Sequence, residues 1–206
     1  MRQLFLIMFF VGMGCYGQTP VLSLYDDEFG AVNGAYYKDT YNDFNNYIGM
    51  WKYTNGTTSL TITLQKKAMK VRNYGQNTIY EDVLVGEYKY IENGVEKINT
   101  LAQLSTDLPN VYSYNIVGKV IIGPNSQYCL NCGPNDRKIL LTFNDPNRYI
   151  EGYDAEMIFQ RADSRGVQKL KLKFRSIGSL LVEQGVTPPY TSYTVPFGEY
   201  VLVKQP

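Results

Sequence analysis

The chain has 206 residues, of which 44% are hydrophobic and 19% charged, a composition that excludes a disordered chain and is typical of a folded domain. The 20 basic and 19 acidic residues leave a net charge of +1, which excludes a strong overall attraction to nucleic acid or anionic membranes. There is no histidine, so Ser-His-Asp and Cys-His catalysis and the usual catalytic zinc sites are excluded. We therefore expect a non-catalytic protein with no cofactor, no metal and no nucleic-acid partner.

The N-terminus has the order of features that an export signal requires. Arg2 supplies a positive start, residues 4–11 form an apolar run, and Gly12, Gly14 and Gly17 follow as small residues. This run is too short to cross a bilayer, which takes about 20 residues, but it suits the hydrophobic part of a signal peptide. We expect removal of residues 1–17, export to the periplasm, cell surface or medium, and no transmembrane segment in the mature protein.

Cys15 offers a second interpretation of the same segment. Gly14 suits cleavage ahead of a lipidated cysteine, whereas Gly12 stands where such signals usually carry a larger apolar residue. Lipid on Cys15 would tether the domain to a membrane. The sequence leaves both interpretations open.

After the signal, residues 18–46 are polar and irregular, with a helical turn expected near Asp43. Residues 47–206 form one antiparallel β domain. Its clearest strand covers residues 57–65, where every second residue is apolar and hydroxyl residues stand between them. The other expected strands are 48–54, 69–74, 83–91, 95–101, 112–122, 138–143, 155–161, 167–175 and 199–204.

Turn signals connect these strands. Asn55-Gly56 and Asn93-Gly94 predict type I′ hairpins, since that turn needs positive φ at both central residues. Residues 163–166 join a third hairpin. About ten short strands without a competing helix predict an all-β fold, either a single up-and-down β-barrel or, alternatively, a β-sandwich.

The first strand contains Gly49-Met50-Trp51, after a short turn. This segment resembles the opening of lipocalin-like (calycin) barrels. The resemblance implies that Trp51 plugs the closed end of a barrel, that Gly49 allows a close backbone approach, and that a basic residue of the last strand packs over the indole ring. Lys204 is the candidate for that cation–π contact. The whole chain also resembles a group of secreted flavobacterial proteins of unknown function, which implies export but no activity.

Cys129 and Cys132 lie in a loop rich in Gly, Pro and Asn. In an exported protein we expect them to form a loop-closing disulfide. A redox-active CxxC motif fits less well, because Gly133-Pro134 follows where such motifs open a helix. Half of a metal site fits poorly, because no second CxxC and no histidine complete it. Two free thiols are the remaining alternative.

Alternate residues of one predicted strand form a basic ladder: Lys169, Lys171, Lys173 and Arg175. The ladder offers a site for an acidic ligand or a lipid headgroup. A solvated strand face that discourages aggregation accounts for the same pattern.

The fold class favours non-catalytic binding of a small apolar or amphipathic ligand, because an eight-stranded barrel encloses room for about one. The alternative is a structural or protein-interaction module of the cell envelope whose barrel is filled by side chains. An internal cavity separates the two. A third hypothesis, a histidine-free hydrolase, rests on acidic pairs that β proteins commonly offer, here Asp154 with Glu156 and Glu81 with Glu87.

Mass spectrometry of the denatured protein from its native envelope tests the export expectations. We expect a chain that begins at Gln18, because cleavage after Gly17 suits the signal, and that binds a thiol-alkylating reagent only after reduction. A full-length mass would contradict the signal. A chain that begins at Cys15 and carries added lipid would select the lipid anchor.

Overall fold

The structure is a computed structural model that describes residues 19–124, 126–129, 132–134, 136–181, 185 and 187–206. The expected signal peptide and Cys15 lie outside these residues. The strands are β1 (Val21–Ser23), β2 (Tyr36–Lys38), β3 (Gly49–Asn55), β4 (Thr58–Tyr74), β5 (Asn77–Glu92), β6 (Val95–Asn99), β7 (Ile116–Ile122), β8 (Lys138–Phe143), β9 (Tyr153–Arg161), β10 (Lys169–Gly178) and β11 (Gly198–Lys204). Among the described residues, no helix is long and apolar enough to cross a membrane.

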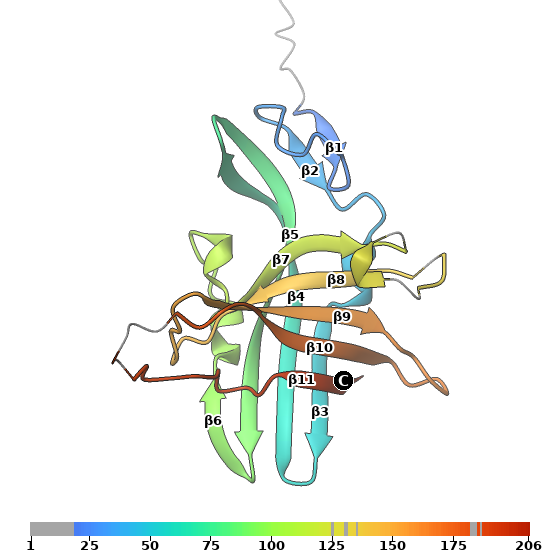
Figure 1. Cartoon of the computed structure of the whole chain (residues 1–206). Coiled ribbons are helices and arrows are strands. Elements are labelled where there is room, and N and C mark those ends of the chain that lie inside the picture. Colours follow the sequence, from blue (N-terminus) through green and yellow to red (C-terminus); the bar gives the residue numbers. More distant parts are fainter. Residues whose placement is uncertain (1–18, 125, 130–131, 135, 182–184, 186) are drawn as a thin grey trace, which may run out of the picture.

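The expected all-β fold is confirmed, and its main sheet closes on itself (Figure 1). Each strand from β3 to β11, apart from β6, pairs with the next in antiparallel order. The last strand returns to the first through the pairs Val203–Lys52 and Lys204–Trp51. The result is a ring of eight strands. This up-and-down order fits the expected barrel and also a two-layer sandwich with joined edges.

The inward side chains of the ring form one apolar cluster. Every ring strand contributes to it, and the large rings of Trp51, Tyr88, Phe159 and Phe174 are at most 1% exposed. An eight-stranded ring has an interior just wide enough for side chains to fill. The packing of this cluster therefore favours the filled interior over an interior that holds a ligand.

The turns agree with the sequence in one hairpin and differ in another. Asn93 and Gly94 both have positive φ, 51° and 80°, between the paired residues Glu92 and Val95, as the type I′ prediction requires. The prediction for Asn55-Gly56 was wrong. Asn55 is still in β3, paired with Thr58, so the turn is centred one residue later, with φ of 57° at Gly56.

One long hairpin replaces several shorter expected strands. The stretches 57–65 and 69–74 are a single strand, β4, interrupted by a bulge between Lys67 and Lys70 where Met69 has φ of 53°. The outer part of the β4–β5 hairpin extends beyond the ring (Figure 1). There β2 pairs with β5 in parallel, and β1 pairs with β2 in parallel. These two strands lie within residues 18–46, which were expected to be irregular. The prediction missed them because a strand of three residues is too short to show a periodic pattern. The helix η1 (Asp43–Asn46) lies where the helical turn is expected.

Buried carboxylates attach this N-terminal segment to the ring. Asp82 of β5 accepts hydrogen bonds from the Tyr36 hydroxyl (2.5 Å) and from the N–H groups of Asp39 (3.1 Å) and Met69 (3.3 Å). It also forms an ion pair with the Lys66 ammonium (2.8 Å). Burial acts to raise the pKa of Asp82, but the hydrogen bonds from Lys66, Tyr36 and the Asp39 N–H outweigh it, and the pKa is lowered. Asp39 in turn accepts from the N–H groups of Asp43 and Phe44, and so holds η1 in place.

We expect Asp82→Asn to lower the free energy of unfolding at pH 7 by about 2 kcal/mol. This is less than a fully buried pair would lose, because Lys66 keeps Asp39 as a partner and is partly exposed. The pKa of Asp82 is lower in the folded state than in the unfolded state, so its contribution is present above a pH of about 4 and is lost as the pH falls through the folded-state pKa.

Urea unfolding between pH 7 and pH 3 measures this difference. The gap between Asp82→Asn and the wild type should narrow at the acid end. Asp27→Asn, which changes an exposed carboxylate of the same segment, is the control and should follow the wild type throughout. A gap that is independent of pH would contradict the assignment.

Candidate functional site

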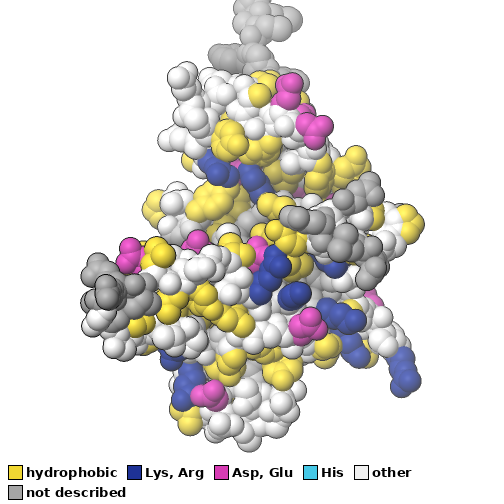
Figure 2. Space-filling model, in the orientation of Figure 1, with side chains coloured by type: hydrophobic (Ala, Val, Ile, Leu, Met, Phe, Trp, Pro, Cys, Tyr) yellow, Lys and Arg dark blue, Asp and Glu magenta, His cyan; other side chains and the backbone are white. Residues whose placement is uncertain are grey.

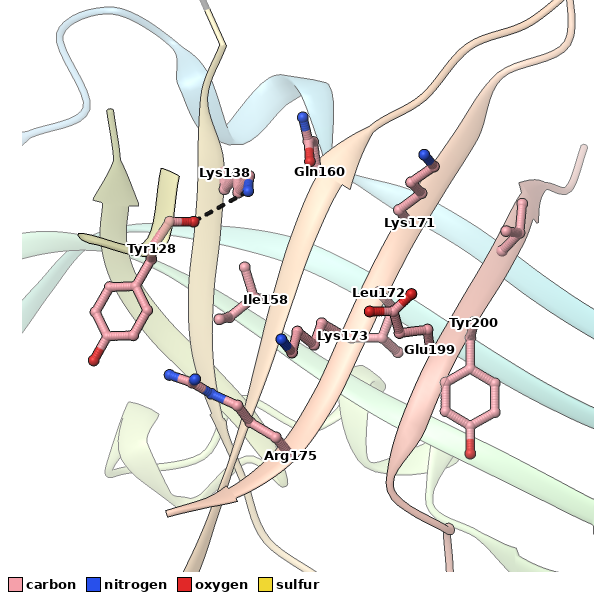
Figure 3. Close-up of a pocket in the computed structure, with 11 residues that line it drawn as sticks. Tyr128, Lys138, Ile158, Gln160, Lys171, Leu172, Lys173, Arg175, Glu199 and Tyr200 are labelled. Atoms are coloured by element: carbon pink, nitrogen blue, oxygen red, sulfur yellow. Dashed lines mark hydrogen bonds between the residues drawn. The ribbon is translucent and has the colours of Figure 1, made fainter. Parts of the chain in front are cut away.

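A concave surface lies on the outside of the ring, across strands β8 to β11. We call it the basic groove (Figure 3). Its volume is about 450 Å³, within the range of pockets that hold small ligands. Its lining residues are Tyr128, Lys138, Ile158, Gln160, Lys171, Leu172, Lys173, Arg175, Glu199, Tyr200 and Val201.

Strand alternation places these side chains. On β10 the apolar residues Leu170, Leu172 and Phe174 are buried in the ring, so Lys171 and Lys173 between them face outward. The neighbouring strands then determine what stands beside each lysine. Lys171 has Gln160 and Val201 directly opposite, and Lys173 has Ile158 and Glu199.

Tyr128, the residue that precedes a disulfide, forms one wall of the groove. The expected disulfide between Cys129 and Cys132 is present, and Cys129 is buried with Ile122 and Ile158. The preceding residue, Tyr128, places its ring 5.0 Å from the guanidinium of Arg175. Its carbonyl oxygen accepts a hydrogen bond from Lys138 Nζ at 3.1 Å, so the loop is attached to β8 as well as to β10.

The members of the basic ladder have different electrostatic partners. Arg175 is paired with Glu156, the residue directly opposite on β9; the Glu156 side chain is buried and the Arg175 side chain is 34% exposed. Lys171 and Lys173 are exposed, and neither forms an ion pair with any residue that the structure describes. Lys169 does not line the groove. The ladder therefore supplies two cations that are outside the ion pairs of the described residues, next to a third that is paired with Glu156.

Three of the four carboxylates considered for hydrolysis, Glu81, Glu87 and Glu156, are engaged in other contacts, and the fourth, Asp154, is exposed. Glu81 is fully buried and accepts hydrogen bonds from the Tyr112 hydroxyl and the Lys119 ammonium. Burial, partly offset by Glu81, lowers the pKa of Lys119. Glu87 accepts from the backbone and side-chain N–H groups of Asn115, at 3.1 and 2.6 Å. Within the described ranges, no three His, Cys, Asp or Glu side chains are grouped so that they could hold a metal ion.

The Gly-x-Trp segment and the last strand meet at one end of the ring. Lys204 lies opposite Trp51, with Nζ 5.4 Å from the centroid of the indole ring. Gly49 has φ of 119°, and a Cβ there would lie 3.1 Å from Lys204 Cε. Glycine is thus required both by the backbone conformation and by the lysine that crosses it. Trp51 Nε1 donates to the Tyr47 carbonyl at 2.7 Å.

Sequence reasoning missed a second cation at Trp51. The guanidinium of Arg161, at the end of β9, lies 5.3 Å from the indole ring centroid and donates to the Asn46 carbonyl at 3.1 Å. No local pattern announces this contact, because it joins positions 110 residues apart, from Trp51 to Arg161. The sequence analysis also did not identify Glu199 and Tyr128 as lining residues of the groove.

We expect Lys204→Met to lower the free energy of unfolding by about 1 kcal/mol, because it removes a partly buried cation–π contact and keeps most of the aliphatic stem. Trp51 is the only tryptophan, so its fluorescence reports directly on this site during urea unfolding. Lys204→Arg should retain most of the stability. Lys52→Met, on the adjacent position of β3, is the control for charge loss. Equal stability of Lys204→Met and the wild type would show that the contact contributes nothing.

Comparisons with known proteins give one result. No curated protein matches the chain. No solved structure matches it. A family model described as a family of unknown function, DUF6705, matches residues 1–205. Since the match covers nearly the whole chain, the protein belongs to the DUF6705 family of unknown function.

Proposed function

We propose that this protein is an exported, non-catalytic binding protein that holds an anionic ligand in the basic groove. The observation that carries the proposal is the pair of exposed lysines, Lys171 and Lys173, which line a cavity of about 450 Å³ and form no ion pair with any described residue. The ring interior also supports a binding site on the outer surface, because its apolar side chains pack together as one cluster.

The geometry of β10 makes this pair effective. Residues two apart on one face of a strand are separated by about 6.7 Å, so the two ammonium groups act on one ligand together. The overall charge of +1 does not oppose this, since attraction of a ligand depends on the local field within a cleft. Ile158 lies between the strands at the groove floor and Val201 is half exposed at its side, which gives apolar contact area.

This proposal takes the filled interior from the interaction-module hypothesis and the acidic ligand from the interpretation of the basic ladder as a binding site. The order of features at residues 1–17 and the Cys129–Cys132 disulfide support export. The contact of Lys204 with Trp51 across Gly49 supports the lipocalin-like interpretation of the ring. An envelope component that carries negative charge would fit the groove as well as a free anion.

A nuclear magnetic resonance titration tests the proposal. Citrate, inorganic phosphate and a trisaccharide of uronic acids are added separately to isotopically labelled protein at low ionic strength. We expect at least one of them to shift the amide signals of Lys171, Lys173 and Ile158, and we expect the affinity to fall with added salt, because exposed charges are screened.

Substitution then locates the binding site. The double variant Lys171→Gln/Lys173→Gln should weaken binding at least about tenfold, the loss expected when a ligand loses a charge-assisted contact. Lys97→Gln, on β6 outside the groove and paired there with Glu92, is the matched control and should leave the affinity unchanged. The proposal fails if no anion shifts these amide signals, or if the double variant binds as the wild type does.

A further inference from the structure

One carboxylate stands inside the basic groove. Glu199 of β11 lines the cavity directly opposite Lys173. It is exposed and forms no ion pair with a residue in the described parts of the chain. A site for a bare anion gains nothing from a carboxylate at this position, because like charges repel. Glu199 therefore indicates that the ligand has a second chemical property besides its negative charge.

An ionised carboxylate can only accept hydrogen bonds, so a ligand that uses Glu199 must donate them. An ammonium group is a poor donor here, since four cationic side chains line the same cavity: Lys138, Lys171, Lys173 and Arg175. Neutral hydroxyl groups donate without that repulsion. Gln160, beside Lys171, adds an amide that can both donate to and accept from a hydroxyl.

The groove also offers apolar surface between its polar groups. Ile158 and Val201 lie among the lysines, and the ring of Tyr128 is 38% exposed at the wall. On the face drawn in Figure 2, basic side chains gather near an acidic one, with hydrophobic side chains beside them. A matching ligand has negative charge, hydroxyl groups and an apolar face close together.

We infer that the ligand of the basic groove is an acidic saccharide, an inference that rests on the proposed function. Its carboxylates pair with Lys171 and Lys173, and its hydroxyls donate to Glu199. The C–H faces of its rings pack on Val201 and Tyr128. A cavity of about 450 Å³ accommodates a short oligosaccharide.

The test compares tricarboxylates that carry hydroxyl groups with one that has none. Trimers of galacturonate, glucuronate and mannuronate are the saccharide probes, and propane-1,2,3-tricarboxylate is the probe without hydroxyls. Affinities are measured by isothermal titration calorimetry with the full mature protein. We expect at least one uronate trimer to bind about tenfold more tightly than the hydroxyl-free acid, because only the saccharide satisfies Glu199.

Two variants separate specificity from charge. Glu199→Met removes the acceptor at nearly constant length. It should reduce the ratio of saccharide affinity to hydroxyl-free affinity by about tenfold, since any relief of repulsion acts on both acids. Lys171→Gln should weaken both acids and leave that ratio nearly unchanged.

Other results would overturn the inference. These are a hydroxyl-free acid that binds as tightly as every uronate trimer, a ratio that Glu199→Met leaves unchanged, or a triglutamate peptide that binds more tightly than the saccharides. In each case binding of an anion that depends on Lys171 and Lys173 would leave the proposed function standing. If no anion binds in the groove, both fail.

Discussion

Two residue pairs between the first and last strands of the ring determine which side chains face inward. Pairing of Val203 with Lys52 and of Lys204 with Trp51 closes the sheet. Because side chains alternate along a strand, closure in this register places Trp51 and Lys204 on the inner side and Lys52 and Val203 on the outer side. A shift by one residue would expose the indole ring and bury charges. The apolar interior and the charged exterior therefore depend on the same closure.

The filled interior is the reason why we propose a binding site on the outer surface. Large aromatic residues occupy the inside of the ring, among them Tyr88, Phe143 and Phe174, whose rings pack with centroids 4.7 to 4.9 Å apart. Such packing gives a rigid scaffold, and rigid strands position surface groups more accurately than loops do. The basic groove uses this rigidity, since its lysines project from a strand whose other face is anchored in the core.

The parts of the fold that were predictable are those with a local signal. Alternation of apolar and hydroxyl residues revealed the first half of β4. Asn93-Gly94 revealed the turn between β5 and β6, because few residues adopt positive φ. The bulge at Met69 has no such signal, so β4 was expected as two strands. Similarly, β1 and β2 are strands because β5 extends beyond the ring and offers an edge, a tertiary cause that three residues cannot encode.

The groove shows why sequence reasoning recognised the ladder but not its site. Lys171, Lys173 and Arg175 are equivalent along β10, each a cation on the same face. Their environments differ because of the strands beside them. Arg175 lies opposite Glu156. Its guanidinium is also 5.0 Å from the ring of Tyr128, beside which it lies in Figure 3, so Arg175 forms part of the groove wall.

The two lysines face Gln160, Ile158, Val201 and Glu199, and only the last of these carries charge. Cross-strand neighbours belong to segments far apart in the chain, so one strand read alone cannot distinguish a structural cation from one available to a ligand. The register between β9, β10 and β11 determines that Arg175 lies opposite Glu156 and that the two lysines do not. Strand register therefore acts twice in this fold: between β3 and β11 it closes the ring, and between β9, β10 and β11 it leaves Lys171 and Lys173 outside ion pairs with the described residues.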